Sequence, residues 1–290
     1  MKNKKILVTG AYGLLGTLMS KALKKKGYIV FKHGKKKSRH KNFNLNNYMV
    51  MEKNLNIIKP YMIINLLALT NVDKCEKDIS EALNLNVKIL KNFSQYLKKK
   101  NYKIKFIHIS TDQVYSGNGP HKEENSKPIN IYGLTKLLGE LNIIDTKALV
   151  LRTNFVGRSQ TPNRESLTDW FINNLKRKKK INLYKDIYFN PLEINYLVSL
   201  ILKIMNKKIS GTFNLGSKGS LNKSAFLLKI ANQLDLSIDS CKVINSVLSK
   251  KKAPRPKDMV MSCKKFEKTF RIKLPKLSDQ IIKISNSYLN

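Results

Sequence analysis

The sequence predicts an α/β fold, with a Rossmann-like doubly wound parallel sheet and a smaller C-terminal substrate-binding lobe. Two observations indicate this fold class. Between residues 5 and 153, apolar runs of strand length alternate with segments of helical spacing, which is typical of βαβ units around a parallel sheet. The first apolar run is followed at once by a glycine-rich turn and a helix, as in nucleotide-binding βα units.

Length and composition limit the class of protein. The chain has 290 residues, of which 42% are apolar, enough for one large core or two intimately packed lobes. Its basic start is followed by an apolar run that breaks at Thr9-Gly10, so we expect neither an export signal nor a membrane-spanning helix. We therefore expect a cytoplasmic protein.

Cysteine and histidine usage predicts no metal site. Cys75, Cys241 and Cys263 are odd in number and widely separated, which argues against both a disulfide framework and a zinc site. The four histidines form no cluster along the sequence. His108 stands inside an apolar strand pattern, where we expect a histidine satisfied by its neighbours.

The formal net charge of +37 is the most unusual feature of the composition. Clustered lysine and arginine can bind nucleic acid or an anionic surface by neutralising phosphates. Here the lysine runs fall at expected element ends with little aromatic interleaving, and Asn and Ile are frequent, as AT-rich coding bias would produce. We expect no specific nucleic-acid partner, with nonspecific polyanion binding as the alternative.

The first strand, 5–9, leads into a glycine-rich turn, Gly10 to Gly16, and then into helical spacing through Leu23. Glycines allow the backbone to turn tightly and to approach a pyrophosphate, whose charge lies against the N-terminus of the helix. This turn predicts a dinucleotide cofactor. The alternative is a tight strand-to-helix turn without a ligand.

The second strand, 28–31, bears on the choice between NADP and NAD. An NAD site usually offers Asp or Glu at the end of this strand, and no acid follows Phe31. The chain continues with a basic segment, 32–39, in which Ser38 and Arg39 suit the additional phosphate of NADP. We therefore expect NADP(H), with NAD(H) as the alternative if the basic residues are merely solvated.

The third and fourth strands, expected over 61–69 and 105–109, follow helical segments expected over 49–58 and 79–98. The fourth strand delivers Ser110-Thr111-Asp112 at its carboxyl end, where open parallel sheets present ligands. Thr111 is therefore a candidate catalytic residue. The alternative is an ordinary turn, because Ser-Thr-Asp is also a common turn composition.

Tyr132 and Lys136 are the candidate acid/base pair. They stand four residues apart in a segment, 131–140, whose apolar spacing predicts a helix, so both side chains leave the same face. A tyrosine has a pKa of about 10, but a nearby cation stabilises its phenolate and favours proton transfer near neutral pH. The alternative is a surface helix that carries the two residues by chance.

The domain boundaries lie where the alternation of strands and helices weakens. A further apolar strand, 149–153, completes an expected dinucleotide-binding domain over 1–153. The elements expected after residue 153 are too few for an independent second core. We assign 154–184 and 208–290 to the substrate-binding lobe, and about 185–207 to a segment that returns to the first domain.

Four motifs occur in the order found in a known family. They are Thr9 to Gly16, Ser110 to Tyr115, Tyr132-Gly133-x-Thr135-Lys136-x-x-Gly139-Glu140, and Leu151-Arg152-Thr153. With them the chain resembles the extended short-chain dehydrogenases that act on nucleotide sugars, and more closely the dTDP-4-dehydrorhamnose reductases. Further likenesses are Asn65, the run from Asn71 to Glu76, and the late Arg255-Pro256-Lys257-Asp258, so the resemblance covers nearly the whole chain.

The resemblance implies NADPH-dependent reduction of the 4-keto group of a nucleoside-diphospho-6-deoxy sugar, in cell-surface polysaccharide precursor synthesis. Tyr132 would donate the proton, Lys136 would hold the nicotinamide ribose and lower the pKa of the phenol, and Thr111 would hydrogen-bond the keto oxygen or the phenol. The cofactor-side residues, besides Ser38, Arg39, Tyr132 and Lys136, would be Gly10, Tyr12, Gly13, Leu14, Leu15, Gly16, Asn44, Leu45, Ala68 and Leu69. The substrate-side residues would be Thr111, Asp112, Asn154, Phe155 and Arg255.

Departures from the family pattern bear on the sugar and on assembly. The reductases usually carry Ser-Trp where this chain has Asn154-Phe155, and an acid with an aromatic or apolar residue where it has Asn44-Leu45. These differences leave the hydride chemistry expected and the particular sugar open. Some members dimerise through a metal held by a glutamate just after the glycine motif. Leu18 stands there, so we expect no such metal, and a homodimer stays open.

Two other functions stay open. A nucleotide-sugar 4-epimerase would use the same Tyr132 and Lys136 on a tightly held NAD. A regulatory NADP-binding subunit, resembling the β-subunit of methionine adenosyltransferase, would keep the fold without needing turnover. Dehydration is disfavoured because Gln113 cannot take the proton that this reaction removes.

Overall fold

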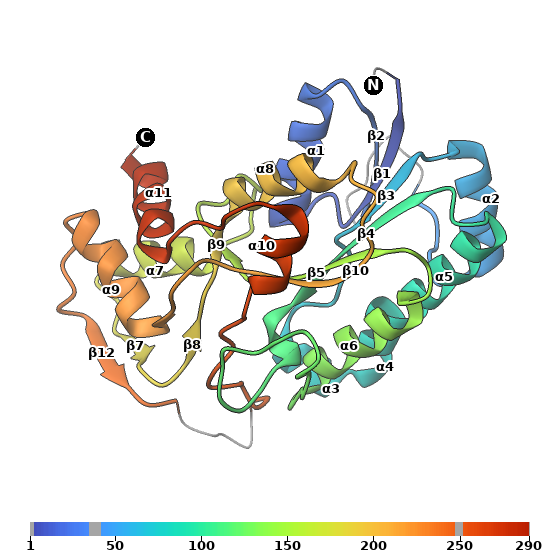
Figure 1. The fold of residues 1–290 in the computed structure, drawn as a ribbon. Coiled ribbons are helices and arrows are strands. Elements are labelled where there is room, and N and C mark those ends of the chain that lie inside the picture. The colour runs from blue at the N-terminus through green and yellow to red at the C-terminus, as the bar shows by residue number, and fades with distance from the viewer. Residues whose placement is uncertain (1–2, 35–41, 247–251, 290) are drawn as a thin grey trace.

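The computed structural model describes residues 3–34, 42–246 and 252–289. Its centre is a six-stranded parallel sheet in the order β2-β1-β3-β4-β5-β10 (Figure 1). The strands are β1 (Lys5–Thr9), β2 (Ile29–His33), β3 (Met62–Asn65), β4 (Lys105–Thr111), β5 (Leu149–Thr153) and β10 (Gly211–Leu215). The strand order reverses direction between β1 and β3, which confirms the expected doubly wound α/β fold.

Helices cover both faces of this sheet because successive side chains of each strand point to opposite faces. Ile6 and Val8 of β1 belong to one hydrophobic cluster and Leu7 to the other, and all three side chains are buried. The helices on the first face are α1 (Leu14–Lys25), α8 (Ile194–Ile204) and α10 (Lys264–Phe270). Those on the second face are α2 (Tyr48–Ile58), α5 (Ile89–Lys99) and α6 (Ile131–Ile143).

A smaller lobe lies beside the sheet and has its own core (Figure 1). This core includes the buried rings of Phe171, Phe189 and Phe226. The lobe is built from α7 (Leu167–Lys176), β7 (Ile181–Tyr184), α9 (Lys223–Gln233), β12 (Cys241–Ile244) and α11 (Leu277–Leu289). Two short strand pairs complete this part of the structure. The pair of β6 (Phe155–Val156) with β9 (Leu192–Glu193) joins the two cores, and the pair of β8 (Tyr188–Phe189) with β11 (Leu221–Asn222) belongs to the lobe.

The expected boundary at residue 208 is wrong for two elements. β10 is the sixth strand of the main sheet, in parallel register with β5. The ring of Phe213 on this strand packs edge-on against Phe270 of α10, at 5.2 Å between centroids. The sequence between residues 208 and 290 is therefore shared by the two domains, because β10 and α10 complete the core under the sheet.

Two expected elements differ in length from those observed. The strand expected over 61–69 ends at Asn65, and the following residues form a loop. The helix expected over 79–98 is divided into α4 (Ile79–Leu83), a π-helical turn over Asn84–Lys88, and α5. The π-turn places the side chain of Asn86 against that loop, where its Oδ1 accepts from the N–H of Leu69 at 2.8 Å.

Helix α6 approaches the turn after β4 and the π-helical turn at Asn86 unusually closely because it carries glycines at these two contact points. A methyl group at Gly133 would lie 2.2 Å from the carbonyl oxygen of Gln113, and one at Gly139 would lie 2.3 Å from that of Asn86. Both distances are too short for any side chain. Gly133 therefore allows α6 to lie close to the turn that follows β4, and Gly139 allows it to lie close to the π-helical turn.

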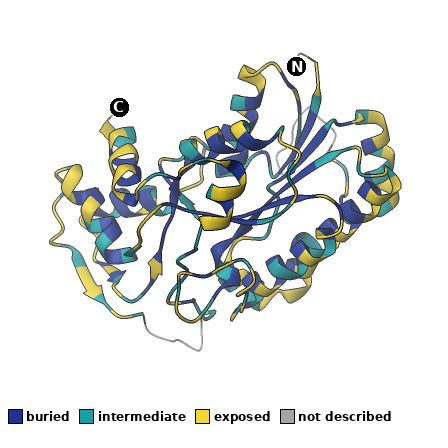
Figure 2. Cartoon of the chain, viewed as in Figure 1, coloured by how far each residue is buried: buried dark blue, intermediate teal, exposed yellow. Residues whose placement is uncertain are grey.

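A buried ion pair fixes α6 to the sheet. Arg152 on β5 donates to the Glu140 carboxylate from Nε at 2.9 Å and from Nη2 at 2.6 Å. Ser110, which stands beside Arg152 in the strand register, donates to the same carboxylate. Arg152 Nη1 also donates to the Tyr115 hydroxyl at 2.8 Å. Figure 2 shows the strands of the sheet buried, with exposed residues on the outward sides of the helices.

Because this pair is buried, Glu140→Gln should destabilise the fold by about 3 kcal/mol, since it leaves the guanidinium without its charged partner. Urea denaturation followed by circular dichroism measures the change. Glu52→Gln is the matched control, because Glu52 pairs with the largely exposed Lys99 on the surface at 2.8 Å. An equal loss in both variants would contradict the role assigned to Glu140.

Candidate active site

Polar residues meet at the carboxyl edge of the sheet because the strands are parallel and in register. Thr9 of β1 stands beside Asn65 of β3, which stands beside His108 of β4. Thr111, at the end of β4, stands beside Thr153 at the end of β5. The sequence thus brings together residues that are far apart along the chain, and all five are buried.

The glycine-rich turn has the shape that a pyrophosphate requires. Gly10 has a φ of +67°, and a methyl group there would lie 2.7 Å from the Leu66 backbone. A methyl group at Gly16 would lie 2.2 Å from the carbonyl oxygen of Gly10. Gly13 caps α1 without a side-chain hydrogen bond, so the helix N-terminus leaves its N–H groups available to an anion. These residues fit a dinucleotide.

The other expected cofactor-side residues lie in different surroundings. Tyr12, Leu14, Ala68 and Leu69 are half-buried around the glycine turn and the loop after β3, whereas Leu15 packs into the core under the sheet. Asn44 is exposed, and the side chain of Leu45 is buried in the opposite core. Leu15 and Leu45 can therefore contact a ligand through their backbone atoms but not through their side chains. Ser38 and Arg39 lie outside the described residues.

Tyr132 lies at the N-terminal end of α6, with its phenol beside the Thr111 side chain, which lowers the pKa of the phenol. Tyr132 packs against Val72 and Cys75 of α3 (Val72–Lys77) and against Ala253. Burial raises the pKa of the Tyr132 phenol above its ordinary value, and the neighbouring Asp112 carboxylate raises it further. The phenol is thus neutral and positioned to donate a proton.

Lys136 lies one turn further along α6, with its ammonium turned toward β4. Its Nζ is 3.0 Å from His108 Nε2 and donates to the Ile109 carbonyl at 2.8 Å. Burial lowers the pKa of Lys136 to about 8, although the charge of Glu140 raises it. Burial sets the direction of the Tyr132 pKa in this arrangement, and the effect expected of Lys136 on the phenol stays a prediction.

Asp112 faces the lobe and carries an unusual carboxyl group. Its Oδ2 accepts from Asn154 Nδ2 at 2.6 Å, and its Oδ1 accepts from the Thr111 hydroxyl at 3.2 Å. Burial raises the pKa of Asp112 to about 6, whereas those two hydrogen bonds and the charge of Lys223 lower it. The expected residues Thr111, Asp112 and Asn154 are therefore joined into one hydrogen-bonded group.

Phe155 and Arg255 lie on the walls of this region. Phe155 is half-buried on β6, in register with Leu192 of β9. Arg255 forms an ion pair with Asp73 of α3 at 3.0 Å, and the N–H of Ala253 donates to the same carboxylate. The late segment around Ala253 is thus held against the Tyr132 end of α6.

The sequence interpretation missed two residues of the site. Asn86 joins the loop after β3 to α6, because its Nδ2 donates to Thr135 Oγ1 at 3.0 Å. Lys223, the first residue of α9, interacts electrostatically with both Asp112 and Arg255. Nothing in the sequence around Asn86 marks it as functional. Lys223 could have been found only from its position after an Asn helix cap.

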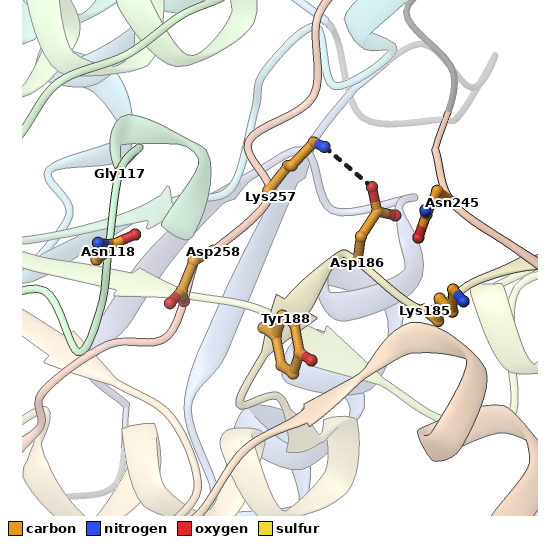
Figure 3. Close-up of a pocket in the computed structure, with 8 residues that line it drawn as sticks. All are labelled: Gly117, Asn118, Lys185, Asp186, Tyr188, Asn245, Lys257 and Asp258. Carbon is orange, nitrogen blue, oxygen red and sulfur yellow. Dashed lines mark ion pairs between the residues drawn. The ribbon is translucent and has the colours of Figure 1, made fainter.

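A separate pocket of about 440 Å³ opens beside the lobe (Figure 3). Gly117, Lys185, Asp186 and Lys257 are among its lining residues, and Lys257 pairs with Asp186 at 3.2 Å. None of the residues expected in catalysis lines it.

Among the described residues no cluster of His, Cys, Asp and Glu could hold a metal ion, and no described helix could cross a membrane.

The parallel sheet, the glycine turn and the Thr111–Tyr132–Lys136 group together define an extended short-chain dehydrogenase fold. The chain belongs to the RmlD substrate-binding domain family, whose sequence pattern matches residues 4–289. This assignment agrees with the resemblance inferred from the motifs.

The chain is also similar to two curated proteins and to one solved structure. A probable low-salt glycan biosynthesis reductase of Haloferax volcanii is 27% identical, over 97% of both chains. Subunit beta of methionine adenosyltransferase 2 from Pongo abelii is 26% identical, over 91% of this chain and 82% of that one. A dTDP-4-dehydrorhamnose reductase from Bacillus anthracis, solved with NADP, shares the fold with a TM-score of 0.87 and 24% identity, covering 98% of this chain and 99% of that one.

The raised pKa of Asp112 predicts a pH-dependent stability. A carboxyl group with a pKa of about 6 in the folded state and about 4 in the unfolded state holds its proton more tightly when folded. The contribution of this carboxyl group to the free energy of unfolding therefore falls by about 3 kcal/mol as pH rises from 4 through 6. The free energy of unfolding of Asp112→Asn should thus increase relative to that of the native protein as pH rises over that range, because the amide does not ionise.

Chemical denaturation of both proteins at several pH values measures this difference. The control is Asp145→Asn, because Asp145 is exposed at the end of α6. A stability difference between Asp112→Asn and the native protein that does not change with pH would contradict the assignment.

Proposed function

We propose that the protein reduces the 4-keto group of a nucleoside-diphospho-6-deoxy sugar with NADPH, as a dTDP-4-dehydrorhamnose reductase does. The observation that carries this proposal is the position of the buried Tyr132 phenol beside Thr111, which stands at the carboxyl edge of the sheet. The glycine turn of β1 and α1 opens at the same edge. A dinucleotide bound there and a sugar over Tyr132 would meet.

The described residues suit acid catalysis of carbonyl reduction. When bound, the reduced nicotinamide supplies the hydride. Tyr132 donates its phenolic proton to the oxygen that becomes the alcohol, and Thr111 hydrogen-bonds that oxygen or the phenol. The Lys136 ammonium lies one helical turn away and stabilises the phenolate that remains. Burial of Tyr132 keeps its proton in place until the substrate oxygen acquires charge.

The substrate side is formed by the Asp112 and Asn154 pair and by the late segment around Arg255. Asp112 and Asn154 can hydrogen-bond sugar hydroxyls, since each has a further lone pair or N–H group. Arg255 and Lys223 supply positive charge suited to a diphosphate. Phe155 offers a smaller apolar surface than the tryptophan usual in the reductases, which suits a different sugar.

NADPH is the preferred cofactor in this proposal. No acid follows β2, and the basic segment after it suits the additional phosphate of NADP. The Bacillus anthracis reductase of the same fold was solved with NADP. The product would enter cell-surface glycan synthesis, in keeping with the glycan biosynthesis name of the Haloferax volcanii relative.

One alternative has a specific observation in its favour. The relative that is a subunit of methionine adenosyltransferase covers nearly the whole chain, at an identity close to that of the reductase relative. The protein would then be an NADP-binding regulatory subunit. Binding of NADPH without turnover of any nucleotide-linked keto sugar would favour this function over the reductase.

In the reductase, Tyr132→Phe should lower kcat about 100-fold to 10,000-fold, because the proton donor is removed while the ring remains. NADPH oxidation with a dTDP-4-keto-6-deoxy sugar, followed by absorbance, measures the loss. Tyr96→Phe is the matched control, since it removes the hydroxyl of another buried tyrosine, which donates to Asn56 of α2 rather than to a residue of the site. Unchanged turnover in Tyr132→Phe would exclude it as the proton donor.

A further inference from the structure

Lys136 is the first of four buried polar side chains that are hydrogen-bonded in a row. Lys136 Nζ is 3.0 Å from His108 Nε2, and His108 Nδ1 is 2.9 Å from Asn65 Nδ2. The Thr9 hydroxyl donates to Asn65 Oδ1. Thr9, Asn65, His108 and Lys136 are each at most 2% exposed. The first three occupy one rung across β1, β3 and β4, on the sheet face covered by α6.

The hydrogen-bond capacities of these groups allow two complete arrangements. A neutral imidazole has one donor and one acceptor nitrogen. In the first arrangement the Asn65 amide donates to Nδ1, so Nε2 carries the proton and donates to Lys136, which must be a neutral amine. In the second, the amide is rotated, Nδ1–H donates to Asn65 Oδ1, and Nε2 accepts from the Lys136 ammonium.

We propose that His108 is a positioning residue that sets the charge of Lys136 through its tautomer, with Asn65 selecting that tautomer. The charged arrangement holds one proton more than the neutral one, and that proton is exchanged with solvent. In the second arrangement the Thr9 hydroxyl accepts from the rotated Asn65 amide, so each of the four side chains keeps a hydrogen-bond partner in both arrangements. The lysine can therefore lose its charge without leaving any of these buried side chains without a partner. The catalytic consequence rests on the proposed function, because only the charged lysine stabilises the Tyr132 phenolate.

One further charged group, Glu140, and the burial of both side chains bear on this equilibrium. Glu140, on the same helix as Lys136, raises the pKa of the lysine, and burial lowers it to about 8. Burial holds the pKa of His108 well below its ordinary value, and the charge of Lys136 lowers it further, so the imidazole stays neutral. The pair therefore exchanges a single proton near pH 8, and that proton belongs to the lysine.

Asn65→Asp tests the proposal because a carboxylate can only accept. It holds the His108 proton on Nδ1 and leaves Nε2 as the acceptor for the ammonium. The midpoint of Lys136 should rise by at least about one pH unit. Protein labelled with ¹³C at the lysine ε-carbons reports that midpoint by NMR, and the Lys136 resonance is assigned by its loss in Lys136→Arg. This measurement requires no substrate.

Two controls separate the imidazole from a simple field effect. In the double variant Asn65→Asp, His108→Phe, the carboxylate remains and the imidazole between it and Lys136 is removed. More than half of the upward shift of the Lys136 midpoint should then disappear. Asn65→Leu, which offers no acceptor, should not raise the midpoint. An equal shift in the double variant, or no shift in Asn65→Asp, would overturn the proposal. Circular dichroism verifies that each variant is folded.

His108→Phe alone keeps the proposal testable if the aspartate variant does not fold. The ammonium loses an acceptor in this variant, so the Lys136 midpoint should fall below that of the native protein. An unchanged midpoint would overturn the proposal. In the active enzyme, kcat/KM should decline above pH 8, and Asn65→Asp should move this decline upward together with the lysine midpoint. Absence of turnover would refute the proposed function and leave the NMR result standing.

Discussion

The buried ion pair between Glu140 and Arg152 is the interaction on which the rest of the site depends. It ties α6 to the strands β4 and β5, and Ser110 adds a third contact directly before Thr111. Burying two charges is costly unless their hydrogen bonds are complete, and here the guanidinium is also bonded to Tyr115 and to the Glu123 carbonyl. Removing one partner would therefore disturb the whole edge.

This constraint explains how one helix brings the two candidate catalytic side chains to the edge of the sheet. Gly133 lets α6 approach the turn after β4, Gly139 lets it approach the π-helical turn, and the ion pair with Arg152 fixes its position against the sheet. Tyr132 then meets Thr111, and Lys136 enters the interior beside His108. The same burial that raises the pKa of Tyr132 lowers that of Lys136. The two groups are thus tuned in opposite directions by one cause.

Much of the fold was predictable because it follows from local patterns. The strands of the first domain are short apolar runs, and the glycine turn has few conformations open to it, so β1, α1 and a parallel sheet could be inferred, although the order of its strands could not. The membership of β10 and α10 was not predictable, because Phe213 and Phe270 gain their meaning only from packing on each other. The π-turn at Asn86 escaped prediction for the same reason.

The candidate site was predictable where one motif carries the chemistry, as with Thr111, Tyr132 and Lys136. It was not predictable where the partner comes from another strand, as with Asn65 and His108, or from the lobe, as with Lys223. The central claim is that NADPH delivers hydride to C4 of a 4-keto sugar while Tyr132 protonates the oxygen on that carbon.

The most direct test uses NADPH carrying deuterium at the transferable position of nicotinamide C4, with mass spectrometry and NMR of the nucleotide sugar. The account predicts deuterium at C4 of the reduced sugar. Recovery of a sugar without deuterium, or of an epimer without net oxidation of NADPH, would contradict it.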